Sequence, residues 1–139
     1  MKDKSTETTH VLVADNNSIF RAGIRSFLNG TNPGIKIVGE ADDCEETLEL
    51  IKQRQPDVVL LDSSIARGKG EFEVLEEICT GEDSPRVIVM TPENDINPII
   101  QSLSNGAMGV LTKDVTAPEL KQAVNRAALI RGGLPPRRN

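Results

Sequence analysis

Four polar side chains stand where runs of apolar residues end, and together their types suit phosphoryl chemistry. They are Asp15, Asp62, Thr91 and Lys113. Carboxylates can hold a magnesium ion and one can attack phosphorus, while a hydroxyl and an ammonium group can bind phosphoryl oxygens. Each residue alone is more often structural, and Asp62 could simply cap the turn that follows it. Their shared position at strand ends favours the functional interpretation.

The apolar runs before these residues predict strands that are buried on both faces. Four apolar residues fill positions 58–61 between two aspartates, and similar runs span 10–15 and 85–91. Continuous runs of this kind are typical of parallel sheets. Further strands are expected at 35–41, on an edge, and at 107–112. Strand and helix patterns alternate five times, which predicts a doubly wound α/β domain with a five-stranded parallel sheet.

The expected strand order is the flavodoxin-like 2-1-3-4-5. In this order the first and third strands are neighbours at the point where the order of the sheet reverses, and the fourth lies next to the third. Because parallel strands share one carboxyl edge, the four polar groups are then expected to meet in a single crevice.

Helix signals fill the gaps between these strands. Ser18 is expected to cap the first helix, and Asp42 and Asp43, each followed three residues later by a glutamate, give capping-box signatures for the second. Residues 63–70 are expected to form a loop rich in glycine. The fourth helix is indicated by apolar residues at helical spacing, namely Ile96, Ile99, Ile100 and Leu103.

Composition excludes several classes of function. The 139 residues, 37% of them hydrophobic, suit one domain, and the net charge of -5 argues against a nucleic-acid surface. Two cysteines, Cys44 and Cys79, make no disulfide framework or zinc spacing, so we expect reduced thiols and a cytoplasmic protein. No apolar run approaches the ~20 residues of a membrane span, and no membrane partner is expected.

Whole segments of the chain resemble the receiver domain of two-component response regulators. The segments that carry this resemblance are Val11–Asp15, Pro56–Asp62, Val87–Thr91 and Gly106–Asp114. Three more segments resemble the NarL/FixJ subfamily, whose receivers precede a LuxR-type helix-turn-helix: Phe20–Arg25, Val38–Ala41 and Lys113–Asp114. The resemblance covers about residues 10–131. It implies a signalling phosphoacceptor rather than an enzyme.

The resemblance also assigns roles to particular residues. It implies that Asp62 accepts a phosphoryl group from a sensor histidine kinase, that Thr91 is the switch hydroxyl and that Lys113 contacts the phosphoryl group. It further implies a magnesium site formed by Asp15, Asn16, Asp62 and the backbone carbonyl of Ser64.

The resemblance implies a domain organisation and partners as well. We expect a disordered leader over 1–9, the receiver domain over 10–131 and a linker over 132–139. DNA contact is expected only through a C-terminal domain outside this chain, where the LuxR-type output would control transcription. A homodimer is expected through the fourth helix, the fifth strand and the fifth helix.

Three residues depart from the pattern of the family. Asn16 stands where a second acid usually ligates magnesium, so weak metal binding is expected. Pro92 follows the switch hydroxyl, where the resemblance implies a backbone N–H that binds the phosphoryl group, and proline has none. Val110 replaces the usual Tyr or Phe of the fifth strand. In the loop after Asp62, Arg67 and Lys69 add positive charge beside the pocket.

These departures leave two hypotheses open. One is a switch driven by phosphorylation of Asp62, and the other is a receiver-like module that dimerises or binds a partner without phosphorylation. Two classes of enzyme fit the sequence less well than these hypotheses. A phosphatase of the haloacid-dehalogenase kind would need an acid at Ser64, and a dinucleotide enzyme would need glycines after the first strand, where the chain has Asn16 and Asn17.

Overall fold

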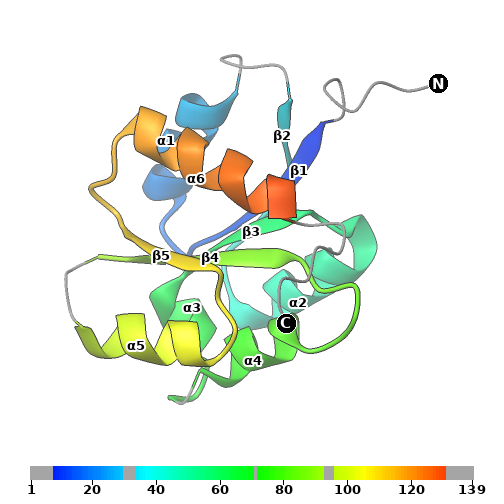
Figure 1. Cartoon of the computed structure of the whole chain (residues 1–139), viewed down its shortest axis with the longest axis vertical. Coiled ribbons are helices and arrows are strands. Elements are labelled where there is room, and N and C mark those ends of the chain that lie inside the picture. The colour runs from blue at the N-terminus through cyan, green and yellow to red at the C-terminus, as the bar shows by residue number, and fades with distance from the viewer. Residues whose placement is uncertain (1–7, 30–33, 71, 93–95, 131–139) are drawn as a thin grey trace.

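The structure is a computed structural model of the chain and describes residues 8–29, 34–70, 72–92 and 96–130 (Figure 1). Its strands are β1 (Thr9–Ala14), β2 (Ile35–Ala41), β3 (Val58–Asp62), β4 (Arg86–Thr91) and β5 (Gly109–Thr112). Its helices are α1 (Ser18–Leu28), α2 (Cys44–Arg54), α3 (Ser63–Arg67), α4 (Glu73–Cys79), α5 (Ile96–Ser104) and α6 (Ala117–Ile130). The expected leader lies outside the described residues up to residue 7, and the expected linker lies wholly outside them.

The five strands form one sheet in the order β2-β1-β3-β4-β5, and every neighbouring pair is parallel. This confirms the predicted flavodoxin-like order. The central strand β3 is buried along its whole length, as its unbroken apolar run predicts. The sheet therefore has two edges, β2 and β5, and β1 lies directly beside β3.

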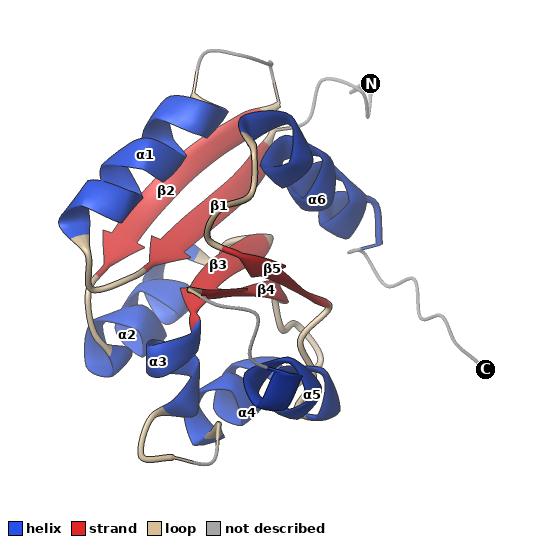
Figure 2. Cartoon of the chain, turned by 90° about the vertical axis from the view of Figure 1, so that its left-hand side faces the viewer, coloured by secondary structure: helices blue, strands red, loops and turns tan. Residues whose placement is uncertain are grey.

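Helices cover both faces of the sheet (Figure 2). Helices α1 and α6 pack on one face, where Ile24, Leu28, Leu120 and Val124 meet the side chains of alternate strand residues. Helices α2, α3 and α4 cover the other face, where Leu75 is one of the fully buried residues. The core is almost entirely aliphatic. Among the described residues, every helix is too short or too polar to cross a membrane.

The structure corrects one predicted helix cap and decides between the two candidates for another. Asn17, not Ser18, caps α1: its side chain accepts hydrogen bonds from the backbone N–H groups of Ile19 and Phe20. Ser18 is already the first helical residue. Asp43, not Asp42, caps α2 by accepting from the Glu46 N–H at 2.8 Å. In both cases a neighbouring residue of equal capping propensity has the extended backbone that a cap requires.

Two further regions differ from the sequence prediction. The expected loop after β3 begins with the short helix α3, because Asp62 accepts a hydrogen bond from Ser64 N–H and starts a helical turn. Helix α5 forms as predicted, but it leaves Ile100 and Leu103 54% and 50% exposed. The reason is its position, since α5 packs mainly on the short edge strand β5 and has little sheet to cover.

The two cysteines are free thiols, as expected. Burial raises the pKa of Cys79 to about 11, with a smaller opposing effect from Arg86. Burial also raises the pKa of Cys44, to which the charge of Asp43 adds. Neither thiol is therefore readily ionised at neutral pH, and both behave as small core residues.

Candidate functional site

Two buried carboxylates converge on one ammonium group at the carboxyl edge of the sheet. Lys113 Nζ lies 2.6 Å from Asp15 Oδ2 and 2.7 Å from Asp62 Oδ1. Asp15 is 1% exposed and Asp62 5% exposed. Charged groups so deeply buried require partners, and each carboxylate finds one in the same lysine.

The strand register explains why these residues meet. Ala14 of β1 pairs with Leu61 of β3, so the next residues, Asp15 and Asp62, leave the sheet side by side. On the other side of β3, β4 pairs with β5 so that Thr91 lies opposite Thr112, the residue before Lys113. Lys113 N–H also donates to the backbone oxygen of Thr91 at 2.8 Å. The structure thus brings Asp15, Asp62 and Lys113 into direct contact and joins Thr91 to them through the backbone.

The second oxygen of Asp62 is also occupied. Asp62 Oδ2 accepts from the Ser64 N–H at 3.0 Å and from the Ser64 hydroxyl. The capping role considered for Asp62 is therefore real, but it uses one oxygen only. The other oxygen faces Lys113, so the two interpretations of this residue are compatible.

The loop after β1 orients the other carboxylate. Asp15 Oδ1 accepts from the Asn17 N–H at 2.8 Å, while Asn17 itself caps α1. Asn16 lies between them with an exposed side chain. It is therefore next to the acidic pair in the chain, and its amide would add an oxygen but no charge to a cation site.

The charge balance of the pocket keeps Lys113 protonated. Burial alone would lower the pKa of Lys113, but hydrogen bonding and attraction from Asp15 and Asp62 outweigh it, so the pKa is raised. Two carboxylates and one ammonium leave a net charge of about one negative unit in the pocket. That imbalance favours binding of a further cation.

Sequence reasoning missed two neighbours of this pocket. The Phe20 ring lies against Lys113, with Nζ 4.6 Å from the ring centroid, a distance at which a cation is attracted to an aromatic face. The Arg21 guanidinium donates to the backbone oxygen of Asp15 and to Glu40. Both residues lie in the segment Phe20–Arg25, which is noted above only for its resemblance to the subfamily. Spacing along one helix cannot reveal contacts with a lysine some ninety residues away.

Two of the residues that depart from the family pattern, Pro92 and Val110, lie on the β4–β5 side. Thr91 is buried, and Pro92 directly after it is exposed. Val110 is half-buried and packs on the core cluster that faces α2, α3 and α4. Arg67, the last residue of α3, and Lys69, just after that helix, are both exposed. Apart from the buried Thr91, these residues are thus more exposed than the two buried acids.

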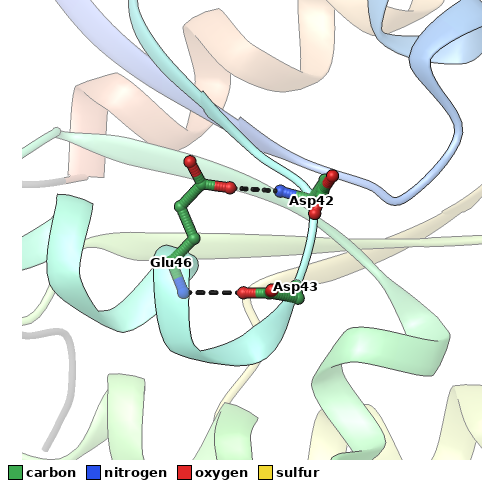
Figure 3. Close-up of side chains that lie close together, drawn as sticks. All are labelled: Asp42, Asp43 and Glu46. Carbon is green, nitrogen blue, oxygen red and sulfur yellow. Dashed lines mark hydrogen bonds between the residues drawn. The ribbon is translucent and has the colours of Figure 1, made fainter.

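A second acidic group lies elsewhere and is explained by helix capping. The carboxylates of Asp42, Asp43 and Glu46 lie close together at the start of α2, and all three residues are exposed (Figure 3). Asp43 accepts from Glu46 N–H, and Glu46 accepts from Asp42 N–H at 3.0 Å (Figure 3). These bonds satisfy the helix start, which is sufficient reason for the three acids to lie together.

Comparison with known proteins places this arrangement in a family. The family model of the response regulator receiver domain matches residues 11–125. The nitrate/nitrite response regulator protein NarL of Escherichia coli (strain K12) is 30% identical over 122 residues, which are 88% of this chain and 56% of that protein. The chain spans about half the length of the curated relatives it matches.

Solved structures that resemble this chain belong to response regulators as well. The signal receiver domain of the response regulator NarL from Mycobacterium tuberculosis has a TM-score of 0.81 at 35% identity, covering 90% of this chain and 99% of that one. A LuxR-family two-component response regulator from Aurantimonas sp. SI85-9A1 has a TM-score of 0.79 at 27% identity, covering 90% and 88%. Sequence, fold and the paired acids thus agree with the resemblance, and the chain belongs to the response regulator receiver domain family, in its NarL/LuxR-type branch.

Proposed function

We propose that this receiver domain accepts a phosphoryl group on Asp62 from the phosphohistidine of a sensor histidine kinase. One observation carries the proposal. The buried Asp62 carboxylate lies at the carboxyl edge of the sheet with Lys113 Nζ 2.7 Å from Oδ1, and the same ammonium lies 2.6 Å from Asp15. A nucleophile and a fixed cation thus stand together where a phosphoryl group can arrive.

The proposed transfer is a displacement at phosphorus. An oxygen of Asp62 attacks phosphorus, the P–N bond to the kinase histidine breaks, and the imidazole nitrogen keeps the bonding electron pair. Lys113 offsets charge on the phosphoryl oxygens, and the Thr91 hydroxyl donates to one of them. Because Asp62 Oδ2 holds two bonds from Ser64, attack through this oxygen requires one of them to open.

The oxygen donors of the pocket fit a magnesium ion, which receiver domains generally bind at their acidic pocket. Two buried carboxylates that already converge on one cation are hard ligands of the kind magnesium prefers. In the proposal, Asp15 and Asp62 hold the ion together with the Asn16 amide oxygen and the Ser64 backbone oxygen. A bound ion would supply positive charge against the phosphoryl group. Because Asn16 carries no charge, we expect binding to be weak.

The proposed output lies in a longer protein. We expect a LuxR-type domain after the linker to contact DNA and to control transcription when Asp62 is phosphorylated. The chain matches only about half of the length of its relatives, which supports this view. One of these relatives carries the name transcriptional regulatory protein LiaR. The pocket of the described residues is negatively charged overall, and in the proposal DNA contact is made by the output domain.

We propose that phosphorylation favours a homodimer through α5, β5 and α6. Ile100 and Leu103 of α5 are half exposed, which is unusual for large aliphatic residues on a helix that faces a sheet edge. A shallow groove of about 660 Å³ lies over β5 and α6, lined by residues that include Val110, Val115 and Arg126. Apolar residues beside such a groove suit contact with a second copy.

The test is direct phosphorylation with an acyl phosphate and magnesium, followed by mass measurement of the intact chain. We expect one added phosphoryl group on the native chain and none on Asp62→Asn. Asp42→Asn, which alters an exposed aspartate away from the pocket, is the matched control and should behave like the native chain. No added mass on the native chain, with either a small donor or a cognate kinase, would contradict the proposal.

A second candidate function is an interaction module that works without phosphorylation. Pro92 favours it, because it follows the buried Thr91 directly and has no N–H to offer a phosphoryl group. In this case the native chain would dimerise equally with and without the phosphodonor. Size measurement at several concentrations, with and without donor, separates the two functions.

A further inference from the structure

Arg21 ties the acidic pocket to the edge strand β2. Its Nη1 donates to the backbone oxygen of Asp15, and its Nε donates to Glu40 Oε1 at 3.1 Å. Glu40 belongs to β2, Arg21 to α1, and Asp15 follows β1. One guanidinium, 17% exposed, therefore joins three elements that are separate in the chain.

Three polar atoms of Asp15 form hydrogen bonds, and the fourth, Oδ2, forms an ion pair with Lys113. Its backbone N–H donates to Ala41 at 2.9 Å, and its backbone oxygen accepts from Arg21. Its Oδ1 accepts from Asn17 N–H, and its Oδ2 faces Lys113. The bond from Arg21 fixes the peptide plane that follows Asp15, which is where the chain turns from β1 toward α1.

Glu40 anchors Arg21 and offsets part of its charge. Burial alone would raise the pKa of Glu40, but hydrogen bonds and attraction from Arg25 and Arg21 lower it, so Glu40 stays ionised. Glu40 is shared with Arg25, so the three side chains together carry about one positive charge. Arg21 thus contributes a fixed direction to the backbone of Asp15, while Glu40 reduces the positive charge that would repel a cation from the pocket.

Arg25 provides an internal comparison. It lies one helical turn after Arg21 and pairs with the other oxygen of Glu40, but its side chain is 45% exposed. Its contact with Glu40 does not extend to Asp15 among the described residues. The two arginines therefore share an anchor and differ in whether they reach the pocket.

We infer that Arg21 is a positioning residue for the phosphoacceptor site, which holds the backbone of Asp15 so that its carboxylate points at the cation position beside Asp62. Glu40 is part of the same device, because it holds the guanidinium in place. The inference rests on the proposed function for its consequence in phosphoryl transfer, but the positioning itself can be measured without magnesium or a phosphodonor.

The first experiment measures hydrogen exchange of the Asn17 amide, which donates to Asp15 Oδ1 and so reports the direction of that carboxylate. We expect Arg21→Ala to lower the protection of this amide about tenfold, equivalent to roughly 1.4 kcal/mol. Arg25→Ala is the matched control and should change it less than twofold. Equal protection in the native chain and Arg21→Ala would overturn the inference, whatever happens to phosphorylation.

The second experiment titrates magnesium into the full chain by NMR. Arg21→Ala should weaken binding about tenfold, and Arg25→Ala should leave it unchanged. Glu40→Gln, which keeps the shape of the anchor, should weaken binding in the same direction and serves if Arg21→Ala does not fold. Equal binding by native chain, Arg21→Ala and Glu40→Gln would overturn the inference while leaving the proposed function intact. If the native chain neither binds magnesium nor accepts phosphate, the proposed function fails and the exchange result alone decides on Arg21.

Discussion

The carboxyl edge of the sheet has two sides that are built differently. On the acceptor side, Asp15, Asp62 and Lys113 are held by bonds at nearly every polar atom. On the readout side, consisting of Thr91, Pro92 and Val110, a buried hydroxyl is followed by an exposed proline, and an aliphatic residue lies on the edge strand. The groups that we propose for phosphoryl transfer are therefore more completely specified than those that we propose to report it.

This difference suggests that the chemistry and its readout can be separated by mutation. The acceptor side resembles a preorganised site, where charges are fixed before any ligand arrives. The readout side leads to α5, which packs on a short edge strand and leaves apolar residues exposed. Changes on the acceptor side should alter the free energy of unfolding and phosphorylation together. Changes at Pro92 or on α5 should alter the rate of phosphorylation or the dimerisation that follows it and leave the free energy of unfolding nearly unchanged.

The largest expected effect is that of Lys113→Met. Removal of the ammonium leaves two buried carboxylates facing each other, and breaking a buried ion pair in this way costs roughly 3 kcal/mol. We expect that loss in the free energy of unfolding, measured with urea in the absence of magnesium. Adding Asp62→Asn to this variant should recover part of the stability, because one of the two charges is then gone. No loss in the single variant would mean that the acceptor side is less tightly coupled than the distances indicate.

The same variant has a signature at high pH. The pKa of Lys113 is raised in the folded chain, so its contribution to stability is complete below the unfolded lysine pKa of about 10.4. That contribution is lost as pH rises through the folded pKa. We expect the native chain to lose stability in this alkaline range by more than Lys113→Met does.

Pro92→Ala tests the readout side. It restores the N–H after Thr91, and one preorganised donor to a phosphoryl oxygen can change a rate by a factor of ten or more. We expect phosphorylation by an acyl phosphate to become about tenfold faster, with little change in the free energy of unfolding. Pro118→Ala, which alters an exposed proline at the start of α6, is the control. An unchanged rate would show that the missing donor is not limiting.

The exposed face of α5 tests the proposed dimer. We expect Ile100→Ser combined with Leu103→Ser to weaken dimerisation of the phosphorylated chain about fivefold, since further burial of the two half-exposed side chains should contribute roughly 1 kcal/mol in total after the costs of association. Ile19→Ser alters a residue that is 82% exposed on α1, outside the proposed dimer surface, and serves as the control. Sedimentation at several concentrations measures the effect. Equal weakening by the control would contradict a specific surface.

The sequence predicted the fold because its strongest signals coincide with its buried strands. The five alternations of strand and helix patterns predicted a parallel sheet, and parallel strands must deliver their ends, here at Asp15, Asp62 and Lys113, to one edge. The contacts of Arg21 and Phe20 could not be predicted from the sequence, because they depend on the orientation of α1 about its own axis on the sheet. Local periodicity specifies which helix face is buried but not which of its residues reaches the sheet edge.

The exposure of Ile100 and Leu103 on α5 could not be predicted from the sequence for a different reason. The spacing of Ile99, Ile100 and Leu103 correctly indicates a helix, yet the same pattern is expected whether the apolar face meets the sheet or a partner. Only the length of β5, which spans Gly109–Thr112, decides how much of that face the chain itself can cover. The predicted strand began at residue 107, and the shorter observed strand leaves more of α5 without cover.

The smallest expected effect concerns Glu40, whose lowered pKa stabilises the folded chain. The contribution is present above the unfolded glutamate pKa of about 4.3 and is lost as pH falls through the folded value. Because Glu40 and Arg25 are partly exposed, we expect less than about 1 kcal/mol between the native chain and Glu40→Gln at neutral pH. Urea unfolding from pH 6 down to pH 3 should show this difference shrinking. A constant difference across the range would mean that Glu40 stabilises α1 by packing, and that the acceptor side does not depend on its charge.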